Sequence, residues 1–140
     1  MTVLVCGANG SIGSFVSQQE AKTHKVVGTY RKYDDHAKEL EKNPNISLVQ
    51  KNMFESTDMK DVVQKAREHG PITKVYWLVG ESWNIGWDKL KLEDIQHAVR
   101  MCAEPLASLI IECKPELSDE NNLMRWASIS GISSLIYAGG

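Results

Sequence analysis

The spacing of apolar residues along this chain changes from one segment to the next. Short runs that are apolar at nearly every position are typical of strands buried on both faces of a sheet. Stretches in which apolar residues recur every third or fourth position lie between them and predict helices. The predicted strands are residues 2–5, 26–30, 46–49, 74–79 and 123–129. The predicted helices cover about 12–23, 37–41, 59–66 and 92–113.

The regular exchange of strand for helix predicts a single α/β domain over residues 1–140. Its architecture would be a Rossmann-like, doubly wound parallel sheet of about five strands in the order 3-2-1-4-5, with helices on both faces. Pro105 falls inside the longest predicted helix and should bend or locally break it. Ligands of such sheets bind at the carboxyl ends of the strands, where the winding direction reverses.

A glycine-rich turn joins the first predicted strand to the first predicted helix. Gly7, Gly10 and Gly13 are spaced three apart, which differs from the Gly-x-Gly-x-x-Gly pattern usual in dinucleotide folds. Main-chain N–H groups at a helix start, together with the helix dipole, attract a diphosphate. A purely structural tight turn is the alternative interpretation. The residues expected to bind the cofactor here are Gly7, Asn9, Gly10, Ser11, Ile12 and Gly13.

The end of the second predicted strand bears on the choice between NAD and NADP. Arg31 and Lys32 stand there, while the first carboxylates, Asp34 and Asp35, come later. An acidic side chain at this point binds the ribose 2′-hydroxyl of NAD, whereas a guanidinium pairs with the 2′-phosphate of NADP. The sequence therefore favours NADP as the cofactor, the alternative being a solvated basic pair on a surface loop.

These motifs resemble the short-chain dehydrogenase/reductase family. The glycine turn of residues 7–13 looks like the glycine motif of its extended and atypical branches, and residues 27–31 look like its NADP-type second strand. The resemblance implies that Asn52 and Met53 lie beside the adenine, although Asn52 could equally be a turn-forming residue. Gly80 is the one residue kept from the family's usual Asn-Asn-Ala-Gly at the end of the fourth strand.

The resemblance also implies an oxidoreductase that transfers hydride between NADP(H) and a small carbonyl or alcohol substrate. Ser128 or Ser130 would orient the substrate oxygen, and Tyr137 would transfer the proton. Departures weaken this expectation, because Gly131 aligns with the family's serine and the partner lysine of Tyr137 would fall at position 141. The serines could instead cap turns and Tyr137 could be a packed aromatic. The alternatives are a non-catalytic NADP(H) sensor or interaction module, and a truncated remnant of such an enzyme.

Composition narrows the possible partners. A net charge of −2 gives no sign of a nucleic-acid or membrane partner, and no segment resembles a signal peptide or a spanning helix. Three scattered cysteines suggest core thiols in a reducing cytoplasm, and four scattered histidines show no metal-ligand spacing. An apolar face on helix 92–113 could support a homo-oligomer or another partner.

Overall fold

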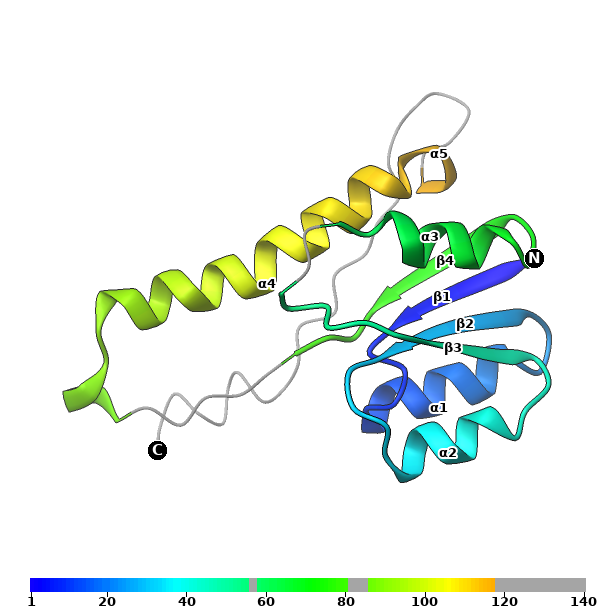
Figure 1. Ribbon diagram of the computed structural model, residues 1–140, viewed down its shortest axis with the longest axis horizontal. Helices are drawn as coiled ribbons and strands as arrows, with labels where there is room; N and C mark the ends of the chain where they lie inside the picture. The colour runs from blue at the N-terminus through cyan, green and yellow to red at the C-terminus, as the bar shows by residue number, and fades with distance from the viewer. Residues whose placement is uncertain (56–57, 81–85, 118–140) are drawn as a thin grey trace.

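The computed structural model describes residues 1–55, 58–80 and 86–117 as a four-stranded parallel sheet with helices on both faces (Figure 1). The strand order is β3-β2-β1-β4, which confirms the predicted order for these strands. The predicted fifth strand, 123–129, lies outside the described residues. The strands are β1 (Thr2–Cys6), β2 (Lys25–Tyr30), β3 (Ile46–Gln50) and β4 (Ile72–Trp77). The helices are α1 (Ser11–Glu20), α2 (Asp35–Glu41), α3 (Lys60–Arg67), α4 (Leu92–Glu112) and α5 (Lys114–Leu117), with a 3₁₀ turn η1 (Trp87–Lys89).

Every residue of β1 is buried, because the strand supplies two cores at once. Val3 and Val5 face the core beneath α1 and α2, whereas Leu4 and Cys6 face the core beneath α3 and α4. Figure 1 shows the two pairs of helices on opposite sides of the sheet. The uninterrupted apolar run that predicted this strand is therefore a direct result of its central position.

The carboxyl ends of the strands lie at nearly the same position along the sheet. In the parallel registers Tyr30 lies beside Gln50 and Cys6 beside Trp77. The turns that follow the four strands consequently meet at one edge of the sheet, which is the place where the fold predicts a ligand.

Both prolines of the carboxyl-terminal helices lie within helical segments. α4 runs without a break through Pro105, so the expected local break is wrong. A proline in a helix removes one hydrogen bond, and Pro105 occupies a buried position of α4. Pro115 is the second residue of α5, where an N–H group needs no partner within the helix.

Cys6 and Cys113 are buried free thiols in the core between the sheet and α4, as predicted for two of the three cysteines. Loss of hydration raises the pKa of both, to about 12 for Cys113. Neither is therefore a reactive thiolate near neutral pH. The side chain of Cys102 lies outside what the structure describes.

The two ends of α4 differ in their packing. Near its carboxyl end, Leu109 is buried and Arg67 of α3 donates hydrogen bonds to the main-chain oxygen of Glu112 (2.9 Å) and to both carboxylate oxygens of Glu116 (2.5 and 3.1 Å). Near its amino end the helix extends away from the sheet (Figure 1), and it exposes the apolar side chains of Leu92, Ile95 and Val99. Self-association through this helix stays a prediction. No helix in the described part of the chain has the length and apolar character needed to cross a bilayer.

Candidate nucleotide-binding site

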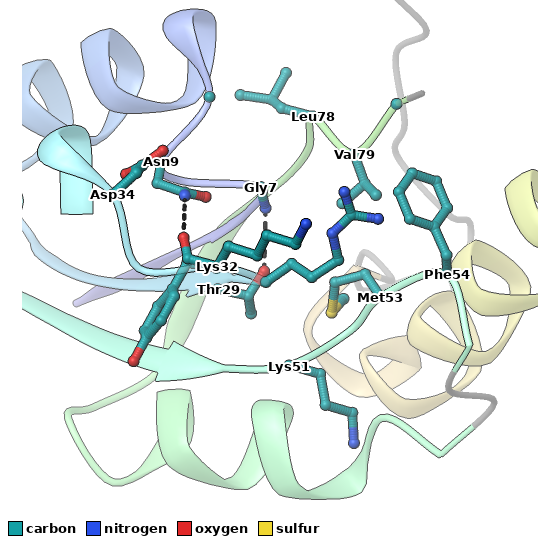
Figure 2. Close-up of a pocket in the computed structure, with 14 residues that line it drawn as sticks. Gly7, Asn9, Thr29, Lys32, Asp34, Lys51, Met53, Phe54, Leu78 and Val79 are labelled. Atoms are coloured by element: carbon teal, nitrogen blue, oxygen red, sulfur yellow. Dashed lines mark hydrogen bonds between the residues drawn. The ribbon is translucent and has the colours of Figure 1, made fainter. Parts of the chain in front are cut away.

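A pocket of about 320 Å³ opens at the carboxyl ends of the strands (Figure 2). Turns from all four strands contribute to it, so residues far apart in the sequence share one wall. Among the predicted cofactor-binding residues, six line it: Gly7, Asn9, Gly10, Arg31, Met53 and Gly80. Lys32, the neighbour of Arg31 in the basic pair, lines it as well. Sequence reasoning did not assign seven other lining residues to the site: Thr29, Tyr30, Asp34, Lys51, Phe54, Leu78 and Val79.

The three glycines of the turn have different structural roles. Gly7 has φ = +81°, and a Cβ there would lie 2.8 Å from the carbonyl oxygen of Leu78. A Cβ on Gly13 would lie only 1.9 Å from the carbonyl oxygen of Gly7, so the helix start can approach the turn only without a side chain. A Cβ on Gly10 would meet nothing closer than 3.5 Å. The fold therefore requires Gly7 and Gly13, whereas Gly10 leaves open space at the pocket.

The amino end of α1 has the features of an anion-binding site. Gly10 is its N-cap and offers no side chain to the first-turn N–H groups, and no acidic residue occupies that turn. Such groups have no acceptor within their own helix, and the helix dipole adds partial positive charge there. Ser11, Ile12 and Gly13 form this first turn and do not line the pocket, and the Ile12 side chain is 68% exposed. Their contribution to an anion would come from main-chain N–H groups.

Thr29 on β2 braces the glycine turn from beneath. Its hydroxyl accepts a hydrogen bond from the Gly7 N–H at 3.0 Å, and its carbonyl oxygen accepts one from the Ala8 N–H at 2.8 Å (Figure 2 shows the first). The Thr29 side chain is fully buried. Because the contact joins residues 22 positions apart, the sequence signalled it only through the predicted pairing of the first two strands.

Asn9 connects the glycine turn to the loop after β2. Its side-chain amide donates to the carbonyl oxygen of Lys32 at 2.9 Å (Figure 2). It also lies beside the carboxylate of Asp34, which caps α2 by accepting from the Ala37 N–H at 2.9 Å. Desolvation opposes ionisation, but the hydrogen bond from Ala37 and the neighbouring Asn9 amide hold the pKa of Asp34 below its usual value. The place of Asp34 in the pocket was not predicted.

The opposite wall of the pocket is basic. Arg31, Lys32 and Lys51 line the pocket and also face an adjoining shallow depression. Lys51 is paired with Asp61 of α3 through both carboxylate oxygens, at 2.9 and 3.0 Å. The Arg31 guanidinium lies 5.8 Å from the ring centroid of Phe54. This wall carries the concentration of cationic side chains that a phosphate monoester would require.

The segment after β3 differs in detail from the expectation. The Asn52 side-chain oxygen accepts from the Phe54 N–H at 3.1 Å, so Asn52 is a turn-forming residue, one of its two predicted roles. It faces the adjoining depression, while Met53 is 3% exposed and lines the pocket. Whether Asn52 also contacts an adenine stays a prediction. The predicted catalytic residues Ser128, Ser130 and Tyr137 lie outside the described residues.

This arrangement places the chain in a recognisable structural class. No known family model and no curated protein matches its sequence. Solved structures do match: NADPH-bound carbonyl reductase from chicken fatty liver (TM-score 0.68, 23% identity, 83% of this chain and 51% of that chain) and a short-chain type dehydrogenase/reductase from Mycobacterium ulcerans (TM-score 0.69, 21% identity, 83% and 46%). An NADP-bound 3-oxoacyl (acyl-carrier-protein) reductase from Agrobacterium tumefaciens matches with a TM-score of 0.68 at 16% identity, over 82% and 46%.

The sheet order and the pocket define a Rossmann-type α/β fold. Its particular form is the fold of the NAD(P)-binding short-chain dehydrogenases/reductases, as the resemblance of the glycine turn predicted. The chain spans about half the length of the structures it matches.

Proposed function

We propose that this chain binds NADP(H) in the pocket at the carboxyl ends of the strands. The diphosphate would lie against the amino end of α1, where Gly10 leaves room for it. The adenosine 2′-phosphate would pair with Arg31 and Lys32 on the basic wall. The observation that carries the proposal is the presence of this cation pair and of Gly10, the N-cap of α1, on the walls of one pocket.

Asp34 is the feature that competes with this proposal, because a carboxylate near the end of β2 favours NAD. Its side chain, however, already accepts a hydrogen bond from the Ala37 N–H and lies beside the Asn9 amide. Figure 2 draws it with Asn9, at the end of the pocket away from Phe54. We therefore assign Asp34 to holding the loop after β2 in place.

The proposed activity is reduction of a carbonyl or oxidation of an alcohol on a small molecule. Support comes from the shared fold and from the chicken protein, whose name records a carbonyl reductase with NADPH bound. Ser128 or Ser130 would orient the substrate oxygen and Tyr137 would transfer the proton. The second candidate is an NADP(H)-binding protein without catalysis. NADPH consumption with a panel of aldehydes and ketones, compared between the natural protein and its Tyr137→Phe variant, distinguishes the two.

The cofactor assignment is tested by equilibrium titration of Arg31→Glu with NADPH and NADH. Loss of a charge-assisted pair and the added repulsion should weaken NADPH binding by about a hundredfold, and NADH binding by less than about threefold. Lys22→Glu, an exposed residue outside the pocket, makes the same change in net charge and should alter neither affinity. Equal losses for both cofactors in Arg31→Glu would contradict the 2′-phosphate assignment.

A further inference from the structure

Phe54 lines the pocket, and none of the predicted cofactor contacts involves it. It follows the buried Met53 in the turn after β3, and its ring is partly buried. The chain has one other phenylalanine, Phe15 on α1, which is 63% exposed and does not line the pocket. Figure 2 draws Phe54 at the end of the pocket away from Asn9 and Asp34.

The backbone that carries Phe54 is held in place by its two preceding residues. The Asn52 side-chain oxygen fixes the Phe54 N–H at 3.1 Å, and Met53 anchors the same turn in the core. An aromatic side chain has few rotatable bonds, so a ring on a fixed turn loses little freedom when a ligand covers it. The turn therefore offers a preformed flat apolar surface at the pocket.

One face of this ring already receives a flat cation. The Arg31 guanidinium carbon lies over it at 5.8 Å from the ring centroid, which is within the range of a cation–π contact. A purine base is flat as well, and its stacking on an aromatic ring does not depend on a matched hydrogen-bond pattern. The same residue that contacts the ring, Arg31, is the one expected to pair with the 2′-phosphate of the cofactor.

We propose that Phe54 is the adenine-stacking residue of this pocket. The base takes a face of the Phe54 ring, and Arg31, attached to the end of β2, pairs with the phosphate on the adjacent ribose. This inference rests on the proposed function. Phe54 would thus determine the affinity for the base, whereas Arg31 determines the preference for the 2′-phosphate.

The test compares Phe54→Leu with Phe54→Tyr and with the control Phe15→Leu, using the full chain and fluorescence titration. Phe54→Leu keeps an apolar side chain but removes the ring, and it should weaken NADPH and NADH binding by the same factor, roughly tenfold. Phe54→Tyr should retain the wild-type affinity, and Phe15→Leu should change neither cofactor.

A cofactor analogue gives a readout that a structural role would not change. Wild-type protein should bind NADPH more tightly than its analogue with cytosine in place of adenine, because the smaller base stacks less. In Phe54→Leu the ratio of the two dissociation constants should be closer to one. Its logarithm should be less than about half of the wild-type value. An unchanged difference would overturn the proposal, because the ring would then not contact the base.

Two other outcomes separate this inference from the proposed function. A loss limited to NADPH in Phe54→Leu would mean that the ring acts only by holding Arg31, and adenine stacking would be rejected while NADP(H) binding stands. Failure of the wild-type chain to bind either NADPH or NADH would reject the proposed function and the stacking role together.

Discussion

The two walls of the pocket are built in different ways. On the glycine side, main-chain groups of Gly7 and Gly10 and the start of α1 form the surface, and the buried Thr29 hydroxyl braces it. On the basic side, the surface consists of side chains, chiefly Arg31 and Phe54, that emerge from the ends of β2 and β3. The first wall is inseparable from the packing of the domain. The second could change without disturbing the fold, and it is where the choice of cofactor would be made.

The largest expected effect comes from Gly13→Ala on the glycine side. The new Cβ would lie 1.9 Å from the Gly7 carbonyl oxygen, so either the turn or α1 must move. We expect the free energy of unfolding to fall by about 3 kcal/mol or more, measured by urea denaturation. Gly10→Ala is the matched control, with 3.5 Å of clearance, and should cost less than about 1 kcal/mol. Equal losses in the two variants would remove the structural distinction between these glycines.

Gly10→Val separates ligand space from fold stability. The free protein has room at this position, but isopropyl carbons would occupy the space assigned to the diphosphate. Affinity for NADPH and NADH should fall together, by about 3 kcal/mol or on the order of a hundredfold, with little change in the urea midpoint. Unchanged affinity would show that the diphosphate does not lie at this turn.

Thr29→Val tests the brace beneath the glycine wall. The substitution keeps the shape of the side chain but leaves the Gly7 N–H without its acceptor. The free energy of unfolding should fall by about 1–2 kcal/mol, and Thr29→Ser should recover most of it. If Thr29→Val lost no stability, the hydrogen bond to the Gly7 N–H would make no measurable contribution to the fold.

The smallest expected effect is an acid dependence at the loop that joins the two walls. The pKa of Asp34 is lowered in the folded chain, so its ionised form stabilises the fold above the unfolded value of about 3.9. That contribution is lost as pH falls through the folded pKa. Asp34→Asn should therefore lose stability at pH 7 and almost none at pH 2.5, as compared by urea unfolding at both values. If Asp34→Asn lost the same free energy of unfolding at both pH values, the loss would come from the geometry of the α2 N-cap and not from the charge of Asp34.

The glycine wall could be predicted because its determinants are local. An apolar run, spaced glycines and a helical pattern follow one another within a few residues, and each has one dominant structural interpretation. Arg31 was found for the same reason, since it directly follows a recognisable strand. The sheet order of the described strands then followed from the exchange of strands with helices.

The basic wall could be predicted only in part because it depends on register. Lys51 and Phe54 reach the pocket because β3 pairs with β2 so that Gln50 lies beside Tyr30, which no local pattern specifies. Asn52 shows the same limit, because its hydrogen bond to the Phe54 N–H depends on the conformation of a turn. The local break expected at Pro105 does not occur, because the intrinsic effect of a residue on a helix is often overridden by its tertiary surroundings, and Pro105 is buried.

The central position of β1 has a consequence for synthesis of the chain. Thr2 pairs with Lys25 on one side and with Ile72 on the other, so one partner strand leaves the ribosome much later than the other. Until then, the emerging polypeptide carries a largely apolar strand with one unpaired edge, the kind of segment that promotes aggregation. We expect chaperone dependence to end once β4 has been translated and can close that edge.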